Sequence, residues 1–364
     1  MENLRIPGPT PCPAEVLKAM GRQMINHRGP EFGRILNDVT DKLKRLFQTK
    51  HDVFVLTASG TGGLEAAIVN VLSPGDKVLS VSIGVFGDRF ASIAQQFGAE
   101  VVPLKVEWGK AADPDAMRQA LKANPDVKAV LITHNETSTG VTNDLASLSA
   151  AVKEFDKLLL IDAISSLGSI NLPVDEWHCD VTVTGSQKGW MVPPGLAMVS
   201  VSPEAWQAHA EAKMPHFYWD FTRAKNYLER NQTPWTPAVS IVFALEVSLD
   251  MLLKEGLSNI FTRHARIAQA ARDGVKALGL SLFADEKHAS NTVTAVAGSN
   301  GLDINKMRKI MREEHQIVLA GGQQRLDGQI FRIGHLGLVT EDDIKGVMSA
   351  LKVVLPQAGF GSVS

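Results

Sequence analysis

The sequence predicts an α/β protein built on a mostly parallel sheet of seven strands, followed by a smaller α+β unit. Seven short runs of β-branched and apolar residues lie within the first 201 residues, and several are separated by amphipathic segments of helical length. The runs are apolar at consecutive positions, which is typical of strands covered by helices on both faces. After about residue 255 the order of expected strands and helices changes, which indicates a second unit.

The expected elements begin with a Pro-rich, extended N-terminal segment at residues 1–20, and a helical pattern covers Pro13–Gln48. A large domain follows at residues 21–255. Its expected strands are Val53–Thr57, Lys77–Ser82, Val101–Val106, Ala129–Thr133, Leu158–Asp162, Val181–Thr184 and Leu196–Val201. Helices are expected between them at Asp88–Phe97, Asp113–Ala123 and Leu145–Phe155.

Residues 203–231 are rich in aromatic side chains and fit no clear pattern, whereas Val239–Glu255 has a strong helical pattern. The small C-terminal domain is expected at residues 256–364. Its expected elements are a strand at Thr292–Ala297, a helix at Ile304–Glu314, strands at Ile317–Leu319 and Ile330–Ile333, and a helix at Glu341–Val354.

The composition argues against several classes of partner. The net charge of −2 over 364 residues offers little attraction to a polyanion, so we expect neither nucleic acid nor a membrane surface as a partner. No apolar run approaches the length of a membrane span. The two cysteines, Cys12 and Cys179, fit neither a metal-binding spacing nor a disulfide framework. We therefore expect a cytoplasmic protein without a metal site.

The segment around Lys188 is the strongest candidate for chemistry. Lys188 follows an expected strand within Thr184-Gly185-Ser186-Gln187-Lys188-Gly189, and Asp162 ends another strand. An amine at the mouth of a sheet can form a Schiff base with a carbonyl group, and a buried carboxylate can keep a pyridinium nitrogen protonated. A surface lysine beside an aspartate at the edge of the core is the alternative, which this pair alone leaves open.

A glycine-rich turn after the first expected strand suggests a phosphate site. The segment Ser59-Gly60-Thr61-Gly62-Gly63 leads into a helical pattern, where free backbone N–H groups and the helix dipole attract anions. Glu65 stands where a dinucleotide-binding turn requires a small residue, and a Walker lysine is missing. A tight turn without a ligand is the alternative for this segment.

Further polar and aromatic residues follow other strands. Phe86 lies between two glycines after the second strand, and Thr137 lies in the polar segment His134–Gly140 after the fourth. Taken singly, Phe86 fits a core residue and His134 a structural histidine. Ligands of open α/β sheets bind outside the carboxyl ends of the strands. Five candidates follow the carboxyl ends of five different expected strands: Ser59, Phe86, Thr137, Asp162 and Lys188.

With these segments the chain resembles the class V aminotransferases of PLP fold type I, specifically the alanine–glyoxylate and serine–glyoxylate (pyruvate) group. The likeness covers nearly the whole chain. It is carried by Pro7-Gly8-Pro9-Thr10, Ser59-Gly60-Thr61-Gly62, His134-Asn135-Glu136-Thr137-Ser138-Thr139-Gly140, Asp162-Ala163-Ile164-Ser165-Ser166-Leu167-Gly168, Gly185-Ser186-Gln187-Lys188 and Phe331-Arg332-Ile333-Gly334-His335-Leu336-Gly337. The resemblance implies pyridoxal 5'-phosphate as the cofactor.

The resemblance also implies a role for each matching residue. Lys188 would attach the cofactor and shuttle a proton, and Asp162 would pair with the pyridine nitrogen. Ile164 would pack under the ring and Phe86 would stack on it, where relatives usually have tryptophan. Thr137 matches a hydroxyl position near the ring. The phosphate would be held by Ser59, Gly60, Thr61 and Gln187.

Substrate and subunit contacts are implied in the same way. Arg332 matches the arginine that binds the substrate α-carboxylate, and Gly8 lies at the pocket mouth with Pro9, Phe86 and either Trp190 or Trp235. Thr233 and Thr236 lie in a stretch that reaches the phosphate of a neighbouring subunit, which implies a homodimer with shared active sites. His27, Arg28 and Arg89 are expected to be structural.

We therefore expect a ping-pong aminotransferase that moves the amino group of alanine or serine to glyoxylate or pyruvate. Arg332 is the only evident anion clamp, which favours small substrates. The alternatives are an (S)-ureidoglycine–glyoxylate or aminoethylphosphonate transaminase, and a non-catalytic partner subunit that resembles the soluble hydrogenase small subunit. A cysteine desulfurase would need a cysteine in the C-terminal half, and none lies beyond Cys179.

Overall fold

A seven-stranded sheet forms the centre of the larger part of the molecule, as expected. In this computed structural model, which describes residues 2–298 and 301–361, the strands follow the order β2-β10-β9-β8-β5-β3-β4. Strand β10 runs antiparallel to both of its neighbours, and the other strands are mutually parallel. The strands are β2 (Asp52–Ala58), β3 (Lys77–Ser82), β4 (Glu100–Lys105), β5 (Val127–Thr133), β8 (Leu158–Asp162), β9 (Val181–Gly185) and β10 (Gly195–Val201).

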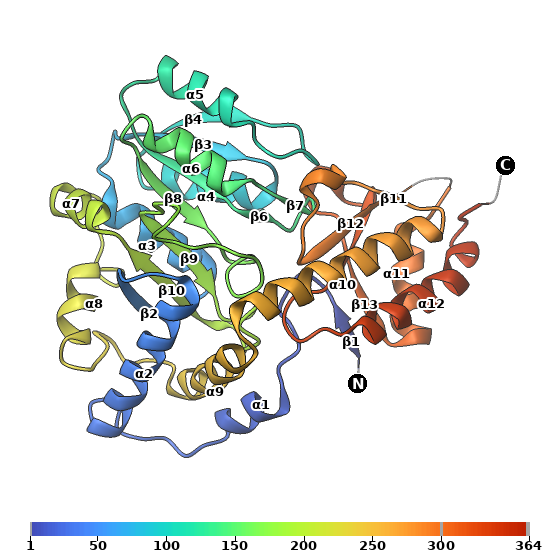
Figure 1. Cartoon of the computed structure of the whole chain (residues 1–364), viewed down its shortest axis with the longest axis horizontal. Helices are drawn as coiled ribbons and strands as arrows, with labels where there is room; N and C mark the ends of the chain where they lie inside the picture. The colour runs from blue at the N-terminus through green and yellow to red at the C-terminus, as the bar shows by residue number, and fades with distance from the viewer. Residues whose placement is uncertain (1, 299–300, 362–364) are drawn as a thin grey trace.

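Helices cover both faces of this sheet (Figure 1), which explains the continuous apolar runs. In β5, Val130 and Ile132 enter one core while Ala129 and Leu131 enter the other. The first core includes α1 (Ala14–Met20), α2 (Pro30–Phe47), α5 (Pro114–Ala123), α6 (Leu145–Lys153) and α9 (Val239–Glu255). The second includes α3 (Gly60–Val71), α4 (Val85–Gln96), α7 (Pro203–Glu211) and α8 (Phe221–Leu228).

The N-terminal region differs from the expectation in two ways. The single helix expected at Pro13–Gln48 is wrong, because α1 ends at Met20 and α2 begins only at Pro30. Proline disfavours helical geometry in the residue before it and suits the first position of a helix, so Pro30 starts α2. The segment 1–20 is not extended throughout, because α1 begins at Ala14; its extended part includes the short strand β1 (Asn3–Arg5).

The C-terminal part forms a second sheet with its own core. Its strands follow the order β1-β13-β14-β12-β11, and β1 lies parallel to β13 at one edge (Figure 1). Helix α9 ends at Glu255, and α10 begins at Leu257 after Gly256 with a φ of 83°. The elements are α10 (Leu257–Ala277), β11 (Ser281–Leu282), β12 (Val293–Ala297), α11 (Ile304–His315), β13 (Ile317–Gly321), β14 (Ile330–Gly334) and α12 (Glu341–Gln357).

Short elements complete the fold. A two-stranded hairpin, β6 (Asn135–Glu136) and β7 (Val141–Thr142), follows β5, and two 3-10 turns lie at Glu286–His288 and Gln324–Leu326. None of the helices in the described ranges combines the length and apolar character needed to cross a membrane. The N-terminal segment connects the two sheets: β1 belongs to the second sheet, and α1 packs on the first. Gly8 lies in the connection between β1 and α1.

Candidate active site

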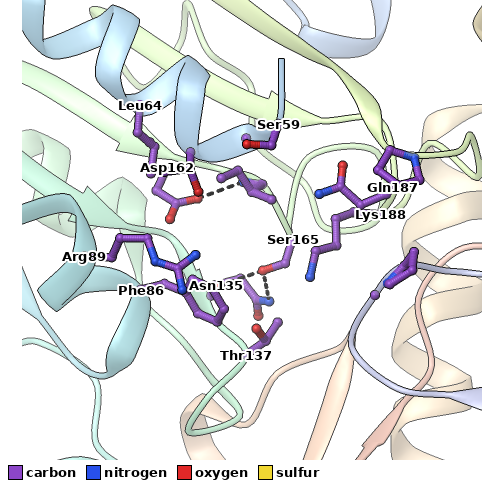
Figure 2. Close-up of a pocket in the computed structure, with 16 residues that line it drawn as sticks. Ser59, Leu64, Phe86, Arg89, Asn135, Thr137, Asp162, Ser165, Gln187 and Lys188 are labelled. Atoms are coloured by element: carbon purple, nitrogen blue, oxygen red, sulfur yellow. Dashed lines mark hydrogen bonds between the residues drawn. The ribbon is translucent and has the colours of Figure 1, made fainter. Parts of the chain in front are cut away.

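A pocket of about 240 Å³ lies at the carboxyl ends of the strands of the first sheet. The structure brings together there the five residues expected to converge: Ser59 after β2, Phe86 after β3, Thr137 after β5, Asp162 at the end of β8 and Lys188 after β9. Figure 2 shows their side chains around a common space. Five other predicted site residues also line it: Gly8, Gly60, Thr61, Ile164 and Gln187.

The amine of Lys188 lies at the centre of this pocket, covered by the N-terminal segment. Its Nζ donates a hydrogen bond to the carbonyl oxygen of Pro7. A Cβ atom on Gly8 would lie 2.7 Å from Lys188 Cδ, and Gly8 has a φ of +123°, so glycine is required at this close approach. Thr10 fixes the lysine loop, since its Oγ1 donates to the carbonyl of Lys188 at 3.0 Å. The amine is thus held in place on a rigid loop.

Asp162 is buried at the opposite side of the pocket. Its Oδ1 accepts a hydrogen bond from the backbone N–H of Ile164 at 3.0 Å. Burial raises the pKa of this carboxyl group to about 7, and the nearby carboxylate of Glu136 adds to the rise. Lys188 and Arg89 oppose it. A positively charged group bound beside Asp162 would therefore restore its ionised form.

A helix N-terminus supplies an anion site at a third side. Helix α3 begins at Gly60, and its N-cap residue Ser59 makes no side-chain cap hydrogen bond, so the first backbone N–H groups keep no intrahelical partner. A Cβ on Gly60 would lie 2.5 Å from Ile164 Cδ1, so glycine here lets Ile164 pack closely against the start of the helix. The Oε1 atom of Gln187, which also lines the pocket, is buried without a hydrogen-bond partner. The free N–H groups of the helix and the NH2 group of the Gln187 amide can donate to a phosphate, whereas its Oε1 atom can only accept.

A buried carboxylate, Glu136, holds the start of α4 in place beneath Phe86. Its Oε2 accepts hydrogen bonds from the backbone N–H groups of Phe86 at 2.9 Å and Gly87 at 3.1 Å, and its Oε1 accepts from that of Ser138 at 3.0 Å. Burial raises the pKa of Glu136, while these hydrogen bonds oppose the rise. The carboxylate thus fixes the aromatic wall of the pocket.

The pocket combines an amine, a buried carboxylate, an aromatic wall and a helix N-terminus suited to a phosphate. The family described as aminotransferase class-V matches residues 3–334. The chain belongs to the class V aminotransferase family. It is 48% identical to the "Soluble hydrogenase 42 kDa subunit" of Anabaena cylindrica, over 98% of this chain and 94% of that protein.

Two further proteins similar to this chain are named as enzymes. The chain is 38% identical to the L-aspartate–glyoxylate aminotransferase of Paracoccus denitrificans, over 98% of this chain and 91% of that enzyme. The solved structure of ureidoglycine–glyoxylate aminotransferase from Bacillus subtilis matches with a TM-score of 0.94 and 30% identity, over 99% of this chain and 94% of that one. The expected fold type I of PLP-dependent enzymes is therefore confirmed.

Pyridoxal phosphate is the cofactor of this aminotransferase family, and the residues of the pocket fit it. Lys188 would supply the amine that attaches it, Asp162 a carboxylate for the ring nitrogen, and Phe86 and Ile164 two apolar surfaces. The N-terminus of α3 suits its phosphate, and the NH2 group of Gln187, which lines the same pocket, can donate to it. These roles remain predictions for the individual residues.

Several predicted residues of the aminotransferase lie elsewhere. Thr233 lines a separate small hollow, where its Oγ1 donates to the carbonyl of Trp235 at 2.7 Å, and Thr236 is exposed. We expected either Trp190 or Trp235 to line the pocket mouth, and this expectation is wrong for Trp190. Its side chain is buried, and its Nε1 donates to Thr184 Oγ1 at 2.9 Å. Trp235 lies by Thr233 and also not at the mouth.

Arg332 is buried behind the pocket wall. Its Nη1 donates to the backbone carbonyl of Thr137 at 2.9 Å, and its Nε to that of Gly321 at 2.8 Å. Burial lowers the pKa of its guanidinium to about 10, while the carboxylate of Glu136 opposes this. Arg332 thus reaches the pocket through Thr137, which lines it.

Sequence reasoning missed three polar residues that line the pocket, namely Arg89, Asn135 and Ser165. The expectation that Arg89 is only structural is wrong, because it lines the pocket and its Cζ lies 4.8 Å from the centre of the Phe86 ring. Its position three residues after Phe86 on one helix was an available signal. Arg28 does have a structural contact, since its Nη1 donates to the carbonyl of Thr233 at 2.5 Å.

The environment of Lys188 predicts an unusual pH dependence of cofactor loading. Burial lowers the pKa of the amine to about 8, and Arg332 and Arg89 lower it further, while Asp162 and Glu136 oppose this. Only the neutral amine attacks an aldehyde, so its reactive fraction grows as the pH rises through the pKa. The rate at which the cofactor-free protein captures pyridoxal phosphate, followed by absorbance, should rise with a midpoint near pH 8 and then level off.

Asp162→Asn provides the control for this titration. It removes the charge that favours the protonated amine, so the midpoint should move below that of the unchanged protein. A capture rate that keeps rising to about pH 10.5, the range of an ordinary lysine, would contradict the prediction.

Proposed function

We propose that this aminotransferase moves the amino group of alanine or serine to glyoxylate or pyruvate in a ping-pong reaction. The observation that carries the proposal is the convergence of Lys188 and Asp162 in one buried pocket, with Arg332 bonded to its wall. Bound pyridoxal phosphate supplies the electron sink that makes the α-proton of an amino acid removable. Lys188, with its pKa near 8, moves that proton.

The small space around Lys188 supports small substrates. The pocket holds about 240 Å³, and the cofactor takes part of it. The N-terminal segment closes it on one side, because Gly8 and Pro9 line it beside the lysine. Arg89 is the guanidinium that lines the pocket, and it packs on Phe86 near Asp162 (Figure 2). Because it lies beside the aromatic wall and the buried carboxylate, we assign Arg89 to the cofactor end of the pocket and not to a second substrate carboxylate, which favours alanine or serine over an acidic donor.

The names of two similar enzymes support glyoxylate as the amino acceptor. Both similar enzymes carry glyoxylate in their names, while their named donors differ. Glyoxylate is therefore the first acceptor to test. An (S)-ureidoglycine or aminoethylphosphonate donor is the alternative within the family, and the ureidoglycine–glyoxylate enzyme of similar structure favours the former.

A non-catalytic role as a hydrogenase partner has one supporting observation, the name of the Anabaena cylindrica relative. The presence of Lys188 and Asp162 in one pocket, with Arg332 hydrogen-bonded to its wall, supports a catalytic role instead. No three His, Cys, Asp or Glu side chains in the described part of the chain are grouped to hold a metal ion. We therefore place transamination first.

We also propose that the enzyme is a cytoplasmic homodimer with shared active sites. An aromatic surface near Thr233 supports an interface, because Phe217 is 64% exposed and Tyr218 43% exposed. Tyr218 stacks on Trp235 at 5.8 Å between ring centres. The free cysteines Cys12 and Cys179 suit a reducing compartment. Light scattering should give twice the chain mass of 39.3 kDa, and a monomer with full activity would contradict the shared site.

The test of function is a pair of half-reactions followed by absorbance. Adding L-alanine or L-serine to the purified holoenzyme should remove the yellow colour of the cofactor's aldehyde form, and adding glyoxylate should restore it. Each donor is tested separately and against ureidoglycine. A yellow protein that responds to none of the small donors would remove the substrate proposal, and a protein that cannot bind the cofactor would remove the enzyme proposal.

A further inference from the structure

The side chain of Gln323 occupies one of the hydrogen-bonding positions of Arg332. Its Oε1 accepts a hydrogen bond from Arg332 Nη1 at 3.2 Å. The same Nη1 donates to the carbonyl of Thr137 at 2.9 Å, and Nε donates to Gly321 at 2.8 Å. The guanidinium has five N–H donors. Among the described residues, Nη2 is therefore the nitrogen of Arg332 left without an acceptor.

This arrangement conflicts with the binding of a carboxylate by two parallel hydrogen bonds. A bidentate contact needs two neighbouring nitrogens of the guanidinium, and only Nη2 is open. One more donor must be released. Both Nε and Nη1 are otherwise held by backbone carbonyls, of Gly321 and Thr137, and the latter belongs to the buried pocket wall. Gln323 is half-buried and makes the longest of the three contacts, so it is the partner that can leave.

We propose that Gln323 is a specificity-determining place-holder whose amide oxygen occupies Arg332 in the free enzyme and is displaced by the substrate carboxylate. This inference rests on the proposed function through the role of Arg332. A buried guanidinium is destabilising when its donors lack acceptors. A carboxylate carries the charge opposite to the guanidinium and accepts from two of its nitrogens, whereas the neutral amide of Gln323 accepts from one. A carboxylate therefore replaces the amide, whereas a neutral ligand does not.

The loop that carries Gln323 is anchored, which keeps the amide near Arg332. The loop joins β13 to β14, and the guanidinium of Arg325 lies 3.7 Å from the centre of the Trp108 ring, next to the edge strand β4. The side chain of Gln329 donates to the carbonyl of Arg325 at 2.6 Å. The loop thus spans the two sheets, and displacement of Gln323 requires only a side-chain rotation.

The test is the affinity of the holoenzyme for propionate, a carboxylate without an amino group, measured by calorimetric titration. Gln323→Met keeps the length of the side chain and removes the competing oxygen, so propionate should bind about three- to tenfold more tightly, the equivalent of one ordinary hydrogen bond. Gln323→Glu places a fixed carboxylate on Arg332, so binding should weaken by at least about tenfold. With a reactive amino acid, Gln323→Met should lower KM and leave kcat unchanged.

Two control variants separate this role from general effects. Gln324→Met makes the same substitution at the neighbouring, exposed position of the same loop, and it should leave propionate affinity unchanged. Arg332→Met should remove propionate binding. If Arg332→Met binds propionate like the unchanged enzyme, the carboxylate does not bind at Arg332 and the place-holder proposal is overturned.

Equal or weaker binding of propionate by Gln323→Met would also overturn the proposal, because Gln323 would then be neutral or an additional donor to the carboxylate. The same holds if neither the unchanged enzyme nor Gln323→Met binds propionate. Failure of the donor proposal has a different signature. If alanine and serine do not react but propionate still ranks the variants as expected, the place-holder role stands and only the choice of substrate is wrong.

Discussion

Replacing Lys188 with alanine is expected to abolish transamination, with a loss of turnover of at least about 10⁴-fold. Lys188 is the only lysine among the described residues that line the pocket. In the proposed reaction its amine both attaches the cofactor and moves the proton, so a single substitution would remove two functions. The measurement is turnover with L-alanine and glyoxylate, together with circular dichroism to show that the fold is unchanged.

The matched control is Lys309→Ala on the exposed side of α11, which should keep full turnover. A small primary amine such as ethylamine should restore part of the activity of Lys188→Ala, because it can enter the space that the side chain leaves. Turnover of Lys188→Ala within tenfold of the unchanged enzyme would assign the chemistry to another group.

The strand pattern made most of the first sheet predictable from the sequence. Both faces of its inner strands are buried, so the strands are apolar at consecutive positions, as Ala129 to Ile132 in β5 show. The short strand β1 was not predictable in this way. Its three residues pair with Ile317 to Leu319, more than 300 positions later in the sequence, and no local pattern encodes a partner at such a separation.

The central part of the site was predictable for a similar reason. Parallel strands end at one edge, so residues that follow them meet without further information. Asn135 and Ser165 were missed because their places depend on tertiary packing: Asn135 Nδ2 donates to Ser165 Oγ at 2.8 Å between two segments far apart in the sequence. Arg89, by contrast, was signalled by its spacing from Phe86 on one helix. The roles of Thr233 and Thr236 depend on a second subunit, and they stay predictions.

Arg332 and Gln323 show the limit of reasoning from motifs. The segment around Arg332 marks it as the carboxylate-binding residue by resemblance. The motif does not reveal that Nε and Nη1 are already bonded within the chain, to Gly321, Thr137 and Gln323. Which donors remain open is a property of the three-dimensional arrangement, and it determines how a substrate must compete for them.

Asp162→Asn is expected to lower turnover by about 10²- to 10³-fold while leaving the fold intact. The amide has the shape of the carboxylate and can still accept the hydrogen bond from the Ile164 N–H, which is 3.0 Å long. It carries no charge, so it cannot stabilise a protonated ring nitrogen. One unit of pKa corresponds to 1.36 kcal/mol, or a factor of about ten in an equilibrium. We expect the substitution to lower the pKa of the ring nitrogen by about two to three units. The fraction of cofactor with a protonated nitrogen, and with it turnover, then falls by a similar factor. Since the pKa of Asp162 is raised to about 7 by burial in the free pocket, the carboxylate is ready to ionise when a cation binds beside it.

The measurement for Asp162→Asn is turnover at neutral pH, compared with that of the control Asp156→Asn. Asp156 is exposed and has a φ of 52°, which asparagine tolerates. Turnover of Asp162→Asn within threefold of that control would show that the charge of Asp162 is not needed for the reaction.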